Sequence, residues 1–236
     1  MIYLYHLIFY QPILNALIFF YETAAFRDFG IAIILTTLLT RLILAPLFHK
    51  GAHQQAVMQR IQPKIKKIQE IHKDDKEKQT RALMDLYKEH GVNPFSSIFL
   101  LIIQIPILIA VYGIIKSGIG SGELGYLYSF IQRPTLINHS FLGILDLGKR
   151  SLFLVLLAAI AQFIQARLVI YRDPSGGTPS SAEKMARQMA FIGPLVTIFI
   201  FYNLPAAVGL YWLISSVFSI FQQLIVNRSV QKKFSS

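Results

Sequence analysis

The sequence predicts an all-α membrane protein with five transmembrane helices, and three observations lead to this prediction. Of the 236 residues, 54% are hydrophobic and only 15% are charged, whereas about a quarter of the residues in soluble domains are charged. The apolar residues gather in runs of about twenty, long enough to cross a hydrocarbon layer of about 30 Å. The basic residues, which give a formal net charge of +11, gather in alternate loops, as the positive-inside rule requires. This distribution assigns the charge to cytoplasmic loops and argues against binding of DNA or other nucleic acids.

Residues 1–28 are predicted to form an interfacial helix and a link. The apolar run within them is interrupted by Pro12, and Gln11, Asn15 and Glu22 lie roughly along one side, as in a helix that lies on the outer leaflet. An extra span is the alternative, because the run is long enough to cross. The N-terminus has neither a basic region nor a small-residue cleavage site, so we expect no cleaved signal peptide.

The five predicted spans are about twenty residues long and contain no Asp or Glu. They are residues 29–48, 93–116, 151–171, 186–203 and 205–226. The segments between and after them are a cytoplasmic hairpin (49–92), an extracytoplasmic loop (117–150), a cytoplasmic loop (172–185) and a cytoplasmic tail (227–236). This order places the N-terminus outside and the C-terminus in the cytoplasm. Because the tail is short and no transit peptide is evident, we expect a multi-pass protein of a bacterial cell (inner) membrane.

The hairpin 49–92 has the largest excess of basic residues of any loop, which places it in the cytoplasm. Apolar residues recur in it at steps of three and four, a pattern typical of amphipathic helices. The residues of this pattern are Val57, Ile61, Ile65, Ile68 and Ile71, followed by Leu83, Leu86 and Tyr87. We therefore predict two helices that turn near residues 73–75.

The first span contains a single charge, Arg41. An arginine inside a span costs about 2.5 to 3.5 kcal/mol on insertion scales, and no acidic residue in the five predicted spans can neutralise it. Arg41 therefore needs water, a cage of backbone carbonyls or a transient acidic partner. We interpret it as lining a water-filled cavity within the helical bundle, and this cavity as the functional site.

Other polar residues at membrane depth gather in the cytoplasmic half of the predicted spans. They are Thr37, Thr40, Gln104, Gln162, Gln165, Ser215 and Ser219, with Ser216, Gln222 and Gln223 beside them. The alternative interpretation is that these side chains join helices by hydrogen bonds, which is common in membrane bundles. Tyr211 and Trp212, near the outer end of the last span, are interpreted as part of an interfacial aromatic belt.

The sequence gives little support for catalysis or metal binding. It contains neither a paired nucleophile and base nor a Gly-rich phosphate loop, the features on which such chemistry depends. His49 and His53 could share a helix face but lack a third ligand. We therefore expect no enzyme, no cofactor and no metal site. A proton-driven transporter is also disfavoured, because it usually needs carboxylates or histidines within the membrane.

Several short motifs occur in order between residues 11 and 228. They are TRLILAPL (40–47), IQPKIKKIQ (61–69), NPF with IIQIPI (93–95 and 102–107), NLPAAVGLYW (203–212) and FSIFQQLIVNR (218–228). Together the motifs resemble the YidC/Oxa/Alb family of membrane protein insertases. The chain departs from that family in lacking the large periplasmic domain of many Gram-negative members and the long basic tail of the mitochondrial kind.

The resemblance implies a five-helix core with a hydrophilic groove, open to the cytoplasm and the lipid and closed to the outside. It implies that Arg41 is the positively charged groove residue and that Pro46 is a hinge. Polar groove partners correspond to Gln162 or Gln165 and to Trp212. A mobile cytoplasmic hairpin is implied as well.

The function implied is that of an insertase and membrane chaperone without nucleotide hydrolysis. It would move short polar segments of nascent membrane proteins through the groove and release their helices into lipid. The implied partners are nascent membrane proteins, membrane lipids and the ribosome, which would dock on the hairpin 49–92 and the basic tail; a Sec translocon is left open. The alternative is a small channel or transporter that uses the same cavity. An ion path would also need a wet route through the outer half of the spans, which is apolar here.

Overall fold

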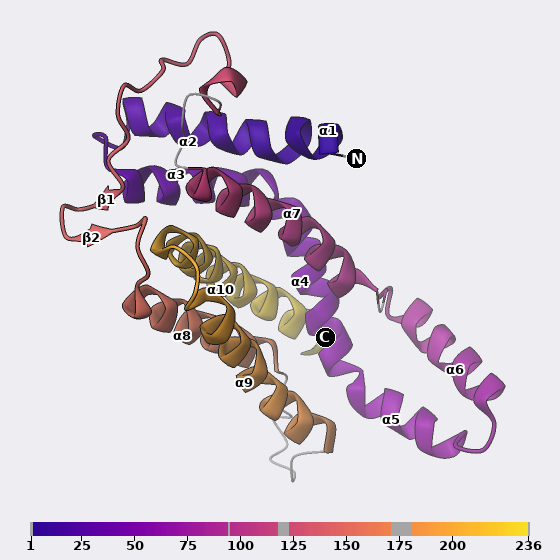
Figure 1. Cartoon of the computed structure of the whole chain (residues 1–236). Coiled ribbons are helices and arrows are strands. Elements are labelled where there is room, and N and C mark those ends of the chain that lie inside the picture. The colour runs from indigo at the N-terminus through magenta and orange to yellow at the C-terminus, as the bar shows by residue number, and fades with distance from the viewer. Residues whose placement is uncertain (1, 94, 118–122, 171–180, 236) are drawn as a thin grey trace.

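The computed structural model of the chain describes residues 2–93, 95–117, 123–170 and 181–235. Most of this backbone is helical, so the predicted all-α fold is confirmed. A bundle of long helices carries a helical hairpin at one end and a two-stranded antiparallel sheet at the opposite end (Figure 1). Of the predicted cytoplasmic loop 172–185, residues 172–180 lie outside the described ranges.

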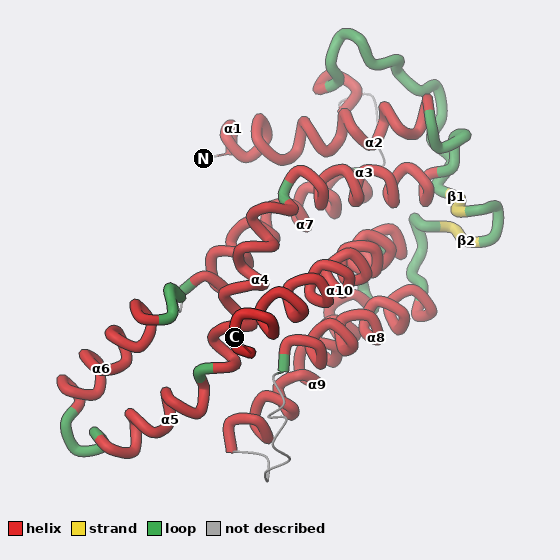
Figure 2. Tube along the Cα trace, turned by 180° about the vertical axis from the view of Figure 1, so that it is seen from behind, coloured by secondary structure: helices red, strands yellow, loops and turns green. Residues whose placement is uncertain are grey.

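The N-terminal segment is one continuous helix built from α1 (Ile2–Tyr5), a π-helical turn (His6–Tyr10) and α2 (Gln11–Thr23). The π-helical turn ends two residues before Pro12, which has no N–H to donate. The helix packs along α3 (Phe29–Ile43), as both views show (Figures 1 and 2). By length and composition it could cross a membrane, and its predicted place on the outer leaflet stays a prediction.

The predicted first span is bent in the structure. Helix α3 ends at Ile43 and α4 (Ala45–Arg60) continues at an angle of 67°. Pro46 explains the break, because it has no N–H for the carbonyl four residues earlier and its ring clashes with that carbonyl. Helix α4 therefore belongs both to the predicted span 29–48 and to the predicted hairpin 49–92.

The two amphipathic helices predicted in the hairpin are present as α5 (Gln62–Ile71) and α6 (Lys76–Glu89). Their apolar faces do not pack only on each other. They join a buried cluster that includes the last turns of α10 (Ala206–Ser235). The wholly or almost wholly buried members of this cluster are Val57, Ile61, Val226 and Val230. The base of the hairpin is therefore attached to the last helix of the bundle.

The remaining long helices are α7 (Ser96–Lys116), α8 (Leu152–Val169) and α9 (Ser181–Phe201). Helices α8 and α10 are each long and apolar enough to cross a membrane, and α3 and α4 pass this test together. The described apolar parts of α7 and α9 are shorter. Helices thus occupy all five predicted spans, and α10 continues as a helix through the predicted tail 227–236 as far as Ser235.

The described part of the loop 117–150 closes the end of the bundle opposite the hairpin. It contains a 3-10 turn (Glu123–Tyr126) and the strands β1 (Ser140–Phe141) and β2 (Leu145–Asp146). Its backbone carbonyls accept hydrogen bonds from the first amides of α10, Ala206 N to Lys149 O at 2.7 Å and Ala207 N to Leu147 O at 3.1 Å. The loop thereby satisfies donors that a helix start leaves unpaired.

The polar side of the N-terminal helix also serves this loop. Asn15 is 2% exposed; its Nδ2 donates to the Tyr126 carbonyl at 3.0 Å and its Oδ1 accepts from the Tyr128 amide at 2.6 Å. Gln11 donates to the same Tyr126 carbonyl. Gln11 and Asn15, two of the polar residues that suggested an interfacial helix, therefore hold the loop 117–150 in place.

Candidate functional site

Arg41 points into the bundle. It lies in the last turn of α3 and is 8% exposed, whereas the next residues, Leu42 and Ile43, are 62% and 67% exposed. Successive residues of a helix face different directions, so the apolar side of this turn faces outward and the cation faces inward. The structure therefore keeps the guanidinium away from the surface that lipid would cover.

The guanidinium lies over an aromatic ring. Its Cζ lies 4.7 Å from the centroid of the Phe48 ring, within the range of a cation–π interaction. Among the described residues Arg41 has no ion pair and no hydrogen bond. Its nitrogens are not among the fully buried unpaired atoms, so the small exposed surface of Arg41 includes them. The cation is shielded but is not cut off from water.

The bend between α3 and α4 creates this contact. Phe48 lies seven positions after Arg41, about 10.5 Å along the axis of a straight helix. The bend is held from α10, where the Nε2 of Gln222 donates to the carbonyl of Ala45 at 2.9 Å. This hydrogen bond joins α10 to the first residue of α4, immediately before Pro46. Pro46 therefore lies at a bend that is hydrogen-bonded to a neighbouring helix, and its role as a hinge stays a prediction.

Tyr211 lies opposite α3 in the interior of the bundle. It is 3% exposed, lies within electrostatic reach of Arg41, and accepts a hydrogen bond from the Nε2 of Gln104 at 2.7 Å. The interpretation of Tyr211 as part of an interfacial belt is therefore wrong. The residue spacing in α10 could have indicated the inward position of Tyr211. Tyr211, Ser215 and Ser219 recur every four residues and so share one helix face.

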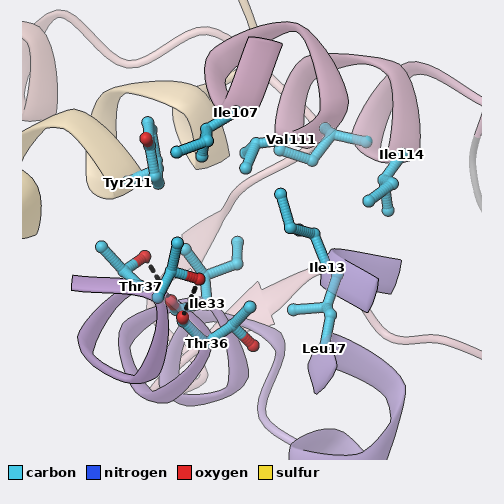
Figure 3. A pocket seen from close by; sticks show the side chains of 11 residues that line it. Ile13, Leu17, Ile33, Thr36, Thr37, Ile107, Val111, Ile114 and Tyr211 are labelled. Carbon is cyan, nitrogen blue, oxygen red and sulfur yellow. Dashed lines mark hydrogen bonds between the residues drawn. The ribbon is translucent and has the colours of Figure 1, made fainter. Parts of the chain in front are cut away.

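A small cavity of about 20 Å³ lies between α2, α3, α7 and α10 (Figure 3). Most of its lining is apolar, with Ile13 and Leu17 from α2 facing Ile107 and Val111 from α7. Its polar lining consists of Thr36, Thr37, Thr40 and Tyr211. A volume of this size has room for about one water molecule.

The threonine hydroxyls of this cavity are already used within their own helix. Each donates to the carbonyl four residues earlier, Thr36 to Ala32 at 2.8 Å, Thr37 to Ile33 at 2.6 Å and Thr40 to Thr36 at 2.8 Å. Such bonds leave each oxygen able to accept but not to donate. The wall that these threonines present beside Arg41 is therefore an acceptor surface and suits a donor such as water or a peptide N–H.

The remaining predicted site residues lie in several places. Gln162 accepts a hydrogen bond from the Thr197 hydroxyl, and this bond joins α8 to α9. For Gln162, the structure thus agrees with the alternative interpretation, in which polar side chains join helices.

Trp212 packs edge-on against Phe201, with 5.2 Å between the ring centroids, and its buried Nε1 has no partner among the described residues. Gln165 is half-buried on α8. Ser215 is buried, and the half-buried Ser219 donates to its carbonyl at 3.0 Å.

A second, wider cleft of about 380 Å³ lies on the hairpin side of Arg41, and the sequence did not indicate it. It is lined by Leu47, Lys50, Gly51 and Gln54 from α4 and by Asn93, Phe95 and Ser96 at the start of α7. Leu47 is the chain neighbour of Phe48. One turn of α4 therefore contacts the cation through Phe48 and lines the wide cleft through Leu47.

The sequence of the chain is similar to those of known membrane proteins. The model of a protein family described as "60Kd inner membrane protein" matches residues 19–233. The chain is 32% identical over 222 residues to the membrane protein insertase YidC of Geotalea daltonii and to that of Geobacter sulfurreducens, covering 93% of this chain and 37% of each relative. The YidC of Francisella philomiragia is 32% identical over 206 residues, covering 86% and 33%. The chain thus spans little more than a third of the length of the curated relatives it matches.

Proposed function

The chain belongs to the family described as the 60Kd inner membrane protein, and from this premise we propose that it is a membrane protein insertase and chaperone. It moves short polar segments of nascent membrane proteins into the bilayer and releases their helices into lipid. It carries out no chemical step and hydrolyses no nucleotide. Relatives that cover most of this chain are named membrane protein insertase YidC, and this supports the proposal.

The observation that carries the proposal is the buried Arg41, which has no carboxylate partner in the part of the chain that the structure describes. A buried cation is usually paired, because leaving it unpaired costs several kcal/mol. Here a ring covers the cation, and the threonine wall and Tyr211 lie beside it. Such a group is free to attract a passing carboxylate or backbone carbonyl of a substrate. The absence of a permanent partner makes that attraction transient, which suits release.

The energy for insertion comes from the substrate itself. Its polar tail must cross hydrocarbon, and a polar site part of the way across shortens the apolar path. Its apolar helix then gains about 25 cal/mol for each Å² removed from water. The outer surfaces of α8 and α9 are apolar, with Ile160 and Phe199 exposed on them, and they offer a route along which the helix passes into lipid.

The partners follow from the same arrangement. The hairpin of α5 and α6 exposes basic side chains that suit anionic lipid headgroups or ribosomal RNA. They are Lys64, Lys67, Lys73, Lys76, Lys78, Arg81 and Lys88. The hairpin and the C-terminus lie on the cytoplasmic side in this proposal, because they carry the largest basic excess, and the N-terminus lies outside.

Insertion by the purified chain in proteoliposomes tests the proposal. Two single-span substrates are compared, one with an acidic tail and one with an uncharged tail. Arg41→Ala is expected to slow the acidic substrate by about tenfold more than the uncharged one, the effect of losing a charge-assisted contact of about 1.5 kcal/mol. Arg41→Lys should largely preserve insertion because it keeps the charge.

The control is Arg167→Ala, which removes a half-buried arginine that also lies over a ring, 5.9 Å from the centroid of Phe163. It should affect the two substrates equally. Equal loss on both substrates in Arg41→Ala would contradict the electrostatic role of Arg41. Ion flux through the purified protein without any substrate would decide for the channel alternative.

A further inference from the structure

We infer that Phe48 is a movable cover over Arg41, and that α4 acts as a gate which Gln222 of α10 holds closed. The inference rests on the role proposed for Arg41 and extends it, because it names the residues that decide when the cation is accessible. Phe48 is a positioning residue in this account. It acts through Arg41 and does not itself bind substrate.

The first step is the contact itself. The centroid of the Phe48 ring lies 4.7 Å from the Cζ of Arg41. Arg41 retains 8% exposure, which includes its nitrogens. The neighbouring residue of the cover, Leu47, lines the cleft of about 380 Å³. Moving this turn of α4 would therefore uncover the cation on the side of an existing opening.

The second step is the hinge that makes such a movement possible. Between α3 and α4, at Leu44, the backbone bends by 67°, and the ladder of helical hydrogen bonds is interrupted because Pro46 has no N–H. Because Pro46 donates no helical hydrogen bond, a change in the angle between α3 and α4 does not break one at this residue. Rotation about the break is therefore the movement of α4 that disturbs the fewest contacts within the helix.

The third step is the pair of contacts that oppose this movement. Near the hinge, Gln222 donates to the Ala45 carbonyl at 2.9 Å. Farther along α4, Ala56 and Val57 pack in the buried cluster with Val226 and Val230. Both contacts hold α4 against α10, one polar and near the cation, the other apolar and next to the hairpin. A partner that binds the hairpin and displaces it would act on α4 at the apolar contact with α10.

The absence of Cys from the chain permits a direct test with a single reporter. Thr37→Cys places a thiol one turn before Arg41, at a position that is 2% exposed. The reaction of this thiol with a water-soluble maleimide is followed in proteoliposomes, in otherwise wild-type protein and in Gln222→Ala and Phe48→Ala. Gln222→Ala should raise the labelling rate about two- to tenfold, the shift in the open population that the loss of one hydrogen bond produces. Phe48→Ala should raise it at least as much, and Phe48→Trp should restore slow labelling because it retains a ring over the cation.

The matched control is Phe221→Ala, which removes an exposed ring from α10 next to Gln222. Its labelling rate should equal that of the reporter alone. An unchanged rate in both Gln222→Ala and Phe48→Ala would overturn the gate, and so would an equal rise in Phe221→Ala, which would indicate a general loosening of the bundle. The measurement uses no insertion substrate. The gate can therefore fail while insertion is upheld, and insertion can fail while the gate is upheld.

Discussion

The guanidinium Cζ of Arg41 lies 4.7 Å from the centroid of the Phe48 ring, across the 67° bend between α3 and α4. On a straight helix the two residues would be about 10.5 Å apart along the axis. A cation–π contact contributes about 0.5 kcal/mol when exposed and about 2 kcal/mol when desolvated. The desolvated value approaches the cost of placing an arginine in a span, which is about 2.5 to 3.5 kcal/mol on insertion scales. The bend is therefore part of how the chain accommodates this cation.

Gly30 is predicted to be the residue that lets the loop 117–150 pack closely on α3. A Cβ at this position would lie 2.1 Å from the Phe141 Cδ2 and 2.7 Å from its Cβ. Gly30→Ala should therefore destabilise the protein by about 1 to 3 kcal/mol, as overpacking does, measured by thermal unfolding in detergent. Gly125→Ala is the control, because a Cβ there meets nothing within 4 Å. Equal melting temperatures for the two variants would show that Phe141 moves aside freely.

The hydrogen bond between Gln104 and Tyr211 is predicted to join α7 to α10. Tyr211→Phe should lower the free energy of unfolding by about 0.5 to 1.5 kcal/mol, because Gln104 loses its acceptor. In a Gln104→Leu background the same change should cost little, which a double-mutant cycle measures. Tyr202→Phe, at an exposed tyrosine of the same bundle, is the control. An equal cost of Tyr211→Phe in both backgrounds would rule out coupling.

Ile61 is predicted to attach the hairpin to the end of α10. It is 1% exposed in the cluster with Val226 and Val230, and removing a buried isoleucine side chain costs about 2 to 5 kcal/mol. Ile61→Ala should therefore speed tryptic cleavage within the basic hairpin. Ile71→Ala, at an exposed isoleucine of the same hairpin, should not. Similar cleavage of both variants would mean that the hairpin moves independently of α10.

The start of α6 is predicted to depend on pH through Asp75. The backbone N–H of Lys78, which donates to this carboxylate at 3.0 Å, and then the Lys78 side chain hold the pKa of Asp75 below its ordinary value of 3.8. A carboxyl group whose folded pKa is lowered stabilises the fold above its ordinary pKa. This stabilisation is lost as the pH falls through the lower, folded value.

Backbone NMR shifts of Lys76 and Lys78 should therefore change towards coil values as the pH falls through that range. Asp75→Asn should remove this dependence while preserving the helix start, because Asn is also a good N-cap. A pH response that persists unchanged in Asp75→Asn would assign the titration to another group.

Much of the fold could be predicted from the sequence, because run length and periodicity are local properties. Helices occupy all five predicted spans and both arms of the predicted hairpin. The end of the last helix could not be predicted from the change in polarity alone. Residues 227–236 are polar but contain no Gly or Pro, so nothing in them stops α10 before Ser235.

For the candidate site, the residue pattern alone predicts that Arg41 faces inward, since a charge within an apolar run has no stable place against lipid. The groups that surround Arg41 depend on how the helices pack together. Helical periodicity states which residues share a face of one helix, but not which neighbouring helix packs against that face. The inward position of Tyr211, the pairing of Gln162 with Thr197 and the approach of Phe48 all depend on those neighbours. Pro46 permits the bend between α3 and α4, and the contacts with α10 set its angle.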